Sequence, residues 1–181
     1  MSYEYNDYDD GYEYYYEEED CCRRPEKKKS KPKQKPNKTM LKCGTPGAVT
    51  LPLATIAGTT FTVATVTVDI SKFCKPCIKF EFASNIVATA AALTLNFQIF
   101  KQCKNQLVPI PVGPVWTFSR LLEITSSDSF SFIACECDSC NEDCCTYSVV
   151  ATVAGLATVG VTSINNAILS ALVVDESCEC C

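Results

Sequence analysis

The chain has 181 residues, a formal net charge of -5, 14 cysteines and no histidine. The absence of histidine excludes Cys-His and Ser-His catalytic pairs, His-containing metalloprotease and deaminase sites, and mixed Cys/His zinc fingers. We therefore expect a protein that is not an enzyme and that carries no cofactor.

The first 42 residues form two blocks of opposite charge. Residues 1–20 hold seven of the eight tyrosines and nine acidic side chains, and residues 21–42 hold ten Lys or Arg, three prolines and one Glu. High charge density, few apolar residues and repeated proline predict a disordered or extended N-terminal arm over residues 1–42. No nucleic-acid partner is expected, because the acidic block neutralises the basic one and no aromatic residue is interleaved with the lysines.

The sequence carries no recognisable export or membrane signal. Its N-terminus, Met1-Ser-Tyr-Glu-Tyr-Asn-Asp, is acidic where a secretory signal needs basic residues and then an apolar run. The most apolar window, residues 149–161, is too short for a membrane span and is interrupted by Thr152, Gly155 and Thr158. We expect synthesis in the cytosol without a signal peptide, and no membrane span.

From Cys43 onward the sequence is typical of β-structure. Proline residues 109, 111 and 114 predict a loop before Val115, the Ala-rich stretch 88–92 fits a strand or a tight connection better than a helix, and Asn165-Asn166 marks a turn or bulge. Alternating or β-branched runs predict strands over residues 48–56, 60–70, 78–82, 86–99, 115–119 continued by 121–125, 129–134, 146–153 and 161–174. Roughly eight to ten strands joined by short turns predict an all-β antiparallel β-sandwich of jelly-roll type over residues 43–181.

The cysteines fall into three groups, all near loops or chain ends, whereas cysteines of a core are expected mid-strand on the apolar face. The chain ends hold Cys21, Cys22, Cys178, Cys180 and Cys181; a strand tip holds Cys135, Cys137, Cys140, Cys144 and Cys145; strand boundaries hold Cys43, Cys74, Cys77 and Cys103.

These positions favour covalent joining of molecules over rescue of a small core. The part after residue 42 is long enough to bury a core unaided, and thiols on mobile ends are poorly placed to staple it. The five terminal cysteines are therefore our candidates for intersubunit disulfides, and the other nine for disulfides within or between domains. Joining the front of one subunit to the back of the next gives a helical head-to-tail homo-oligomer, with the arm docking beside an exposed strand.

The thiols have two other interpretations, a redox site and a metal site. Cys74-Lys-Pro-Cys77 is a structural bridge or ligand pair rather than a thioredoxin-like site, because a strand follows where that site needs a helix N-terminus. In the alternative interpretation, a reduced metal-binding protein, a local thiolate cluster holds the ion through Cys135, Cys137, Cys140, Cys144 and Cys145.

Three segments carry a resemblance to a known family: Cys74-Lys-Pro-Cys77-Ile-Lys-Phe-Glu-Phe82-Ala-Ser-Asn-Ile86, Phe97-Gln-Ile-Phe100, and Ser129-Phe-Ser-Phe132 running into Cys135-Glu-Cys137. They are similar to a cysteine-rich domain family of unknown function in anaerobic endospore-forming bacteria, over residues 43–181. The arrangement is also similar in architecture to endospore appendage proteins, which are jelly-roll subunits stacked into helical pili. That resemblance implies that Cys21 and Cys22 are connector cysteines bonded to preceding subunits, and that release follows lysis of the mother cell.

The sequence thus predicts a self-assembling structural subunit of a disulfide-cross-linked extracellular or spore-surface filament, a pilus-like or appendage-like fibre. The cysteine-rich metal-binding protein and a spore-coat protein that forms layers stay open as alternatives.

Overall fold

The computed structural model describes residues 38–52, 55–71, 73, 75–104, 106–137, 144–154 and 161–175. In this part of the chain, no helix is long and apolar enough to cross a membrane. The strands are β1 Thr39–Cys43, β2 Gly47–Leu51, β3 Thr60–Asp69, β4 Pro76–Cys103, β5 Ile110–Cys137, β6 Cys144–Val153 and β7 Val161–Asp175. Every pairing between them is antiparallel.

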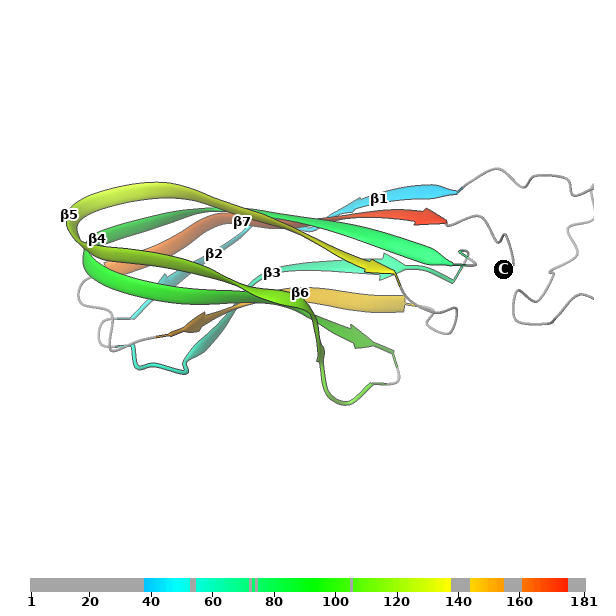
Figure 1. Cartoon of the computed structure of the whole chain (residues 1–181), viewed down its shortest axis with the longest axis horizontal. Helices are drawn as coiled ribbons and strands as arrows, with labels where there is room; N and C mark the ends of the chain where they lie inside the picture. The colour runs from blue at the N-terminus through cyan, green and yellow to red at the C-terminus, as the bar shows by residue number, and fades with distance from the viewer. Residues whose placement is uncertain are drawn as a thin grey trace, which may run out of the picture. The chain divides into compact units, whose positions relative to one another are not determined.

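Two long strands, β4 and β5, each pass through both layers of a sandwich. Residues 76–89 of β4 pair with β7 and with the second half of β5, whereas residues 95–103 pair with β6 and with the first half of β5. The first sheet therefore has the order β1/β2, β7, β4, β5, and the second sheet has the order β3, β6, β4, β5. Figure 1 shows β4 and β5 turning together where they leave one sheet for the other.

This strand order is a jelly roll once β4 and β5 are each counted as two strands. The antiparallel pairs are β1/β2 with β7, β3 with β6, and each half of β4 with the opposite half of β5. The predicted all-β antiparallel sandwich of jelly-roll type is confirmed. The predicted division of β4 and of β5 into separate strands is wrong, because the β4–β5 pairing continues around the corner.

Irregular pairing accommodates the bends. The register of β4 against β5 shifts between Ala91 and Leu93, so the Ala-rich stretch is part of a strand and lies at the corner. In β7, Asn166 has a φ of 51°, and the registers of both neighbouring strands shift beside it. Asparagine tolerates this left-handed conformation, and the predicted turn or bulge at Asn165-Asn166 is a bulge.

Pro111 and Pro114 lie inside β5, so the loop predicted at these positions is wrong. Among the described strands β5 pairs only with β4, and an edge strand accepts proline because its outer side needs no N–H donor. Gly113, with a φ of 69°, lies at a second register shift in this stretch.

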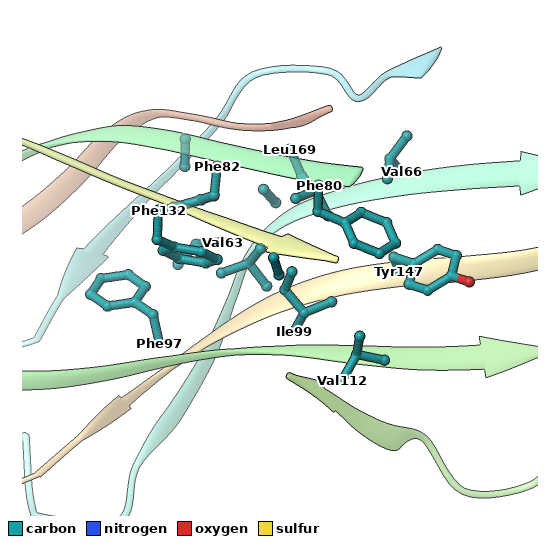
Figure 2. Packing of buried hydrophobic residues seen from close by; sticks show 14 of the residues in the cluster. Val63, Val66, Phe80, Phe82, Phe97, Ile99, Val112, Phe132, Tyr147 and Leu169 are labelled. Atoms are coloured by element: carbon teal, nitrogen blue, oxygen red, sulfur yellow. The ribbon is translucent and has the colours of Figure 1, made fainter. Parts of the chain in front are cut away.

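The core lies between the two sheets, where alternate side chains of each strand meet. Phe80, Phe82 and Leu169 from the first sheet face Ile99 and Tyr147 from the second, and each is at most 1% exposed (Figure 2). Full burial of one such side chain contributes about 1.5–3 kcal/mol to folding. Apolar burial is therefore the main stabilising term of this sandwich.

Aromatic rings close the side of the sandwich that β5 occupies. Trp116 stacks on Phe132 with ring centroids 4.0 Å apart, and Phe118 meets Phe130 edge-on at 5.8 Å. Trp116 and Phe118 belong to the half of β5 in the second sheet, and the two phenylalanines belong to the half in the first sheet. Aromatic contacts thus join the two halves of β5, each of which is the edge strand of its sheet.

Candidate functional site

The jelly roll brings together cysteines that are far apart in the sequence. Cys77 lies at the start of β4 and Cys103 at its end, and both ends of this long strand lie at the same end of the sandwich (Figure 1). Cys137 ends β5, and Cys144-Cys145 begin β6 at that same end. The site is therefore built from strand termini.

Four of these cysteines form two disulfides. Cys103 bonds to Cys145 with a Cα–Cα distance of 4.0 Å, which joins β4 to β6 in the second sheet. Cys77 bonds to Cys137 with a Cα–Cα distance of 4.1 Å, which joins β4 to β5 in the first sheet. In the chain-entropy description, loops of these lengths stabilise the fold by about 4 kcal/mol per bond.

The two disulfides differ in burial. Cys103 and Cys145 are 8% and 1% exposed, so this bond belongs to the core despite its place at strand ends. In contrast, Cys137 is exposed and Cys77 is half-buried. Cys77 and Cys137 lie on the outer face of the first sheet, since the alternating neighbour Ile78 is buried. Among the described residues there is thus one interior disulfide and one accessible disulfide.

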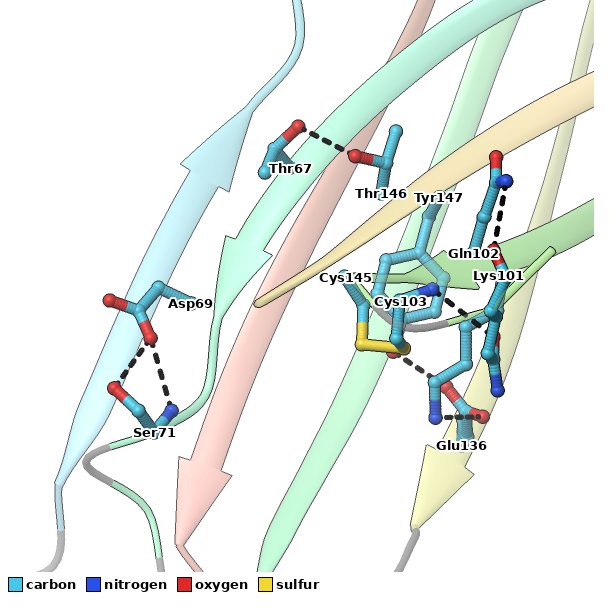
Figure 3. The surroundings of a disulfide bond; sticks show 11 residues. Thr67, Asp69, Ser71, Lys101, Gln102, Cys103, Glu136, Cys145, Thr146 and Tyr147 are labelled. Carbon is cyan, nitrogen blue, oxygen red and sulfur yellow. Dashed lines mark hydrogen bonds and ion pairs between the residues drawn. A yellow bond between two sulfur atoms is a disulfide. The ribbon is translucent and has the colours of Figure 1, made fainter. Parts of the chain in front are cut away.

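A buried polar network lies beside the interior disulfide (Figure 3). The ammonium of Lys101 donates to Glu136 Oε1 at 3.2 Å, and Tyr147 Oη donates to Glu136 Oε2 at 2.9 Å. Lys101 and Tyr147 come from the second sheet and Glu136 from the first, so the network ties the two layers together. Lys101 is 4% exposed, which makes this a largely desolvated ion pair.

This network was not predicted from the sequence. A signal was present, because Lys101 continues the inward alternation of Phe97 and Ile99, which places its charge on the core face. Tyr147 is the one tyrosine outside residues 1–20, and it also occupies an inward position of its strand.

Three described cysteines carry free thiols: Cys43 and Cys135, which are exposed, and Cys144, which is half-buried. Cys43 pairs with Ser170, whose neighbours Leu169 and Ala171 are buried, and Cys135 pairs with Lys79, whose neighbours Ile78 and Phe80 are buried. Both thiols therefore lie on the outer face of the first sheet, one on each of its edge strands. This outer face carries two free thiols and the accessible disulfide.

An ion pair lies between the two edges of this face. Lys79 Nζ is 2.6 Å from Glu81 Oε1, with both side chains well exposed. The hydrogen bond from Lys79 to Glu81 and the charge of Glu81 raise the pKa of Lys79, and the charge of Cys135 adds to this effect. Lys79 is therefore a cation at neutral pH, directly across the ladder from the Cys135 thiol.

The same face has apolar side chains. Leu41 on β1 and Ile133 on β5 are 65% and 57% exposed. A shallow hollow beside Ile133 is lined by Ala83, Ser131 and Ile168 among others. Exposed thiols, an ion pair and apolar side chains on one face suit contact with protein rather than with a small polar substrate.

Several predicted site residues lie outside the described part of the chain. These are the five candidates for intersubunit bonds, Cys21, Cys22, Cys178, Cys180 and Cys181, together with Cys74 and Cys140. Of the five cysteines in the metal alternative, Cys137 and Cys145 are bonded to different partners. In this disulfide-bonded state those two sulfurs are not thiolate ligands, and the described residues hold no group of three metal-ligating side chains.

Strand pairing and sulfur chemistry together define the class of this protein: a disulfide-bonded, all-β jelly-roll sandwich. The family described as a domain of unknown function (DUF4489) matches residues 37–174, and the chain belongs to that family. This match confirms the expected domain family of unknown function. It does not test the resemblance to endospore appendage proteins. A comparison with curated proteins found no match.

Solved structures with a similar fold share little sequence with this chain. Eiger TNF from S. frugiperda is 9% identical with a TM-score of 0.44, over 78% of this chain and 95% of that one. The structure of infectious bursal disease virus Gx strain is 8% identical with a TM-score of 0.41, over 84% of this chain and 42% of that one. The enzymatically active domain of bacteriophage CBA120 tailspike protein 4 is 14% identical with a TM-score of 0.35, over 72% of this chain and 19% of that one. The fold assignment rests on the strand pairing itself.

Proposed function

We propose that this protein is a self-assembling structural subunit of a disulfide-cross-linked filament, extracellular or on a spore surface, and that it is not an enzyme. The observation that carries the proposal is the pair of free, exposed thiols, Cys43 and Cys135, on one face of a sandwich that already has two internal disulfides.

Cys43 and Cys135 of one copy cannot form a disulfide with each other. Cys43 is on β1 and Cys135 on β5, and β7 and β4 lie between them in the first sheet. Three strand spacings separate them by about 14 Å, well beyond the Cα–Cα range that a disulfide spans. A disulfide at either thiol therefore requires a partner from another segment or another copy.

The N-terminal arm supplies thiols with the reach to be that partner. Cys22 precedes the first described residue, Lys38, by 16 positions. An extended chain of this length spans up to about 55 Å, which is more than the width of a small domain. A bond between the arm of one copy and the outer face of the next is heterologous, and repetition of such a contact gives a helical filament.

The sandwich also offers edges for non-covalent contact. Among the described strands β5 leaves one side unpaired along its whole length, and β1, β2 and β3 are edge strands on the opposite side. Unpaired edges are templates for strand addition from another chain. Edge pairing would align copies, and disulfides would then make the assembly independent of concentration.

Electrophoresis and electron microscopy test the proposal together. We expect the oxidised protein to give a ladder on a non-reducing gel that collapses under reduction to the 19.8 kDa chain. Micrographs of the same sample are expected to show fibres. A monomer in both lanes would refute the filament, sheets would favour a coat layer, and stoichiometric zinc or iron in the purified protein would favour the metal-binding alternative.

Single substitutions identify the acceptor thiols. Cys43→Ser and Cys135→Ser are each expected to weaken the ladder, and the double variant to weaken it further. Cys144→Ser removes a free thiol that lies on β6 in the second sheet, not on the outer face of the first sheet. It is the matched control and is expected to leave the ladder unchanged.

A further inference from the structure

The accessible disulfide has a geometry that opens one of its two sulfurs to attack. A thiolate attacks a disulfide in line with the S–S bond, from the side opposite the sulfur that leaves. Behind Cys77 lies β7, whose Val174 is paired directly with Cys77. Behind Cys137 lies the outer edge of β5, which pairs with no other described strand. Cys137 is thus the sulfur that a thiolate can reach.

The interior disulfide lacks this access. Cys145 is 1% exposed, and β6 lies between β3 and β4 in the second sheet. Its partner Cys103 is 8% exposed. Within the same fold, Cys103–Cys145 is therefore protected from thiolates, whereas Cys77–Cys137 is open to attack.

The attacking thiol does not come from Cys135 of the same copy. Cys135 and Cys137 are two residues apart on one strand, which separates their Cα atoms by about 7 Å. Cys135 and Cys77 are diagonal neighbours across the ladder, also about 7–8 Å apart. Both separations are at or beyond the limit of about 7 Å for bridging two cysteines without backbone movement. Cys135 and the Cys77–Cys137 bond of the same copy therefore do not exchange with each other without backbone movement.

We infer that Cys77–Cys137 is a thiol–disulfide exchange site, at which a thiolate from a second copy of this chain attacks Cys137 Sγ. The new bond joins the attacking sulfur to Cys137, the Cys77–Cys137 bond breaks, and its electron pair leaves on Cys77 as a thiolate, which takes up a proton. The number of disulfides and the number of thiols stay constant, so the step needs no oxidant. The choice of a second copy as the source of the thiolate rests on the proposed function; the reactivity of the bond does not.

This site changes how the subunits would be joined. If free thiols were simply oxidised in pairs, every intersubunit bond would require an external oxidant. With exchange, a copy that has formed its internal bond converts that bond into an intersubunit one. Copies joined wrongly can also be released, because the same reaction runs in reverse.

An anaerobic assembly experiment tests the inference on the full-length protein. The chain is oxidised at high dilution, so that internal bonds form first, and is held in mild acid, where thiols are protonated and exchange stops. It is then concentrated without oxygen and brought to mildly alkaline pH. Samples are alkylated, run on non-reducing gels, titrated for thiols and mapped by mass spectrometry. We expect a ladder with an unchanged thiol titre, Cys137 in the intersubunit bond and Cys77 alkylated.

The double variant Cys77→Ser/Cys137→Ser is expected to lose the anaerobic ladder, whereas Cys144→Ser keeps it. Circular dichroism of the double variant shows whether its sandwich is folded. A ladder that forms only after an oxidant is added overturns the exchange site and leaves the proposed function standing. An anaerobic ladder joined at other cysteines, or unchanged in the double variant, also overturns it. No ladder with or without oxidant overturns the exchange site and the proposed function together.

Discussion

At the scale of single residues, the buried network of Lys101, Glu136 and Tyr147 is the most consequential polar feature of the sandwich. A desolvated ion pair contributes little compared with apolar side chains of the same volume, but removal of one partner leaves a buried charge behind. Glu136 is 16% exposed by its side chain, and Lys101 and Tyr147 are its hydrogen-bond partners. The network therefore acts more on the relative position of the sheets than on net stability.

The first prediction concerns the cost of removing one partner of this ion pair. Lys101→Met keeps the length of the side chain and removes its charge, so the Glu136 carboxylate stays buried with one hydrogen bond. We expect a loss of about 3 kcal/mol in the free energy of unfolding, measured by urea denaturation under oxidising conditions. Lys101→Met combined with Glu136→Leu is expected to recover most of this loss, because no uncompensated charge is left.

Tyr147→Phe serves as the matched control for that cycle. It removes the hydroxyl but retains the ring, which packs on Phe80 with centroids 4.5 Å apart. A loss of about 1.5–3 kcal/mol is expected, the usual contribution of a hydrogen bond to a charged group. If Lys101→Met is no more destabilising than Tyr147→Phe, the ion pair is not the desolvated interaction that its burial indicates.

At the scale of elements, the link between β1 and β2 depends on the absence of a side chain. The N–H of Gly44 donates to the carbonyl of Leu169 in β7 at 2.9 Å. A Cβ at Gly44 would lie inside the contact distance of the Thr65 backbone carbonyl in β3. The chain thus passes between an edge of the first sheet and an edge of the second, and only glycine fits there.

Gly44→Ala is therefore expected to destabilise the sandwich by about 1–3 kcal/mol, because neither backbone can move without loss of strand pairing. Gly58→Ala is the comparison: its φ is 87°, but no atom of the described residues lies within 4 Å of a Cβ there. That substitution costs about 1 kcal/mol of backbone strain and no clash. Thermal unfolding of both variants measures the difference, and a Gly44→Ala protein as stable as Gly58→Ala would contradict the close approach.

The two disulfides are expected to respond differently to a mild reductant. In the folded protein Cys77–Cys137 is expected to open well before Cys103–Cys145, because thiolate access rather than loop length controls the rate. Brief reduction, alkylation and mass mapping measure the order. Equal labelling of Cys77 and Cys103 at early times would show that opening proceeds through global unfolding instead.

Much of the fold followed from alternation alone. Alternation predicts the strand over residues 78–82, in which Ile78, Phe80 and Phe82 are buried, and Asn165-Asn166 predicts the turn or bulge that the structure has at Asn166. Alternation does not report where a strand bends, because a bulge at Ala91 leaves both flanking patterns intact. This is why β4 and β5 were divided. Proline was misread for a related reason: its effect depends on whether the strand is an edge, which only the topology decides.

The pairing of the cysteines could not be predicted from the sequence. Cys77 and Cys137 are 60 positions apart and meet because β5 returns along β4. Spacing carries no information about such a meeting, whereas topology fixes it. For the same reason the two free edge thiols could not be distinguished from the bonded ones before the strand order was known.

At the scale of the whole molecule, the proposed filament needs two complementary surfaces on each copy. The outer face of the first sheet provides the acceptor, with Cys43, Cys135 and the exchange site at Cys137. In the proposed filament, Cys21 and Cys22 of the arm are the donors. The two surfaces belong to different parts of the chain, so one can be removed without the other, which a symmetric dimer contact would not allow.

Deletion of residues 1–37 separates donor from acceptor. The family match begins at residue 37 and β1 at Thr39, so we expect the truncated chain to keep its sandwich and its unfolding temperature. Alone, it is expected to form no filaments. Mixed with the full-length chain before oxidation, it accepts an arm and offers none, so it terminates growth. Mean filament length in electron micrographs is then expected to fall as its mole fraction rises. Full-length protein with Cys21→Ser and Cys22→Ser is the matched control for loss of the thiols alone, and it is expected to end filaments in the same way. If lengths are unaffected by the truncated chain, growth does not proceed from the arm of one copy to the face of the next.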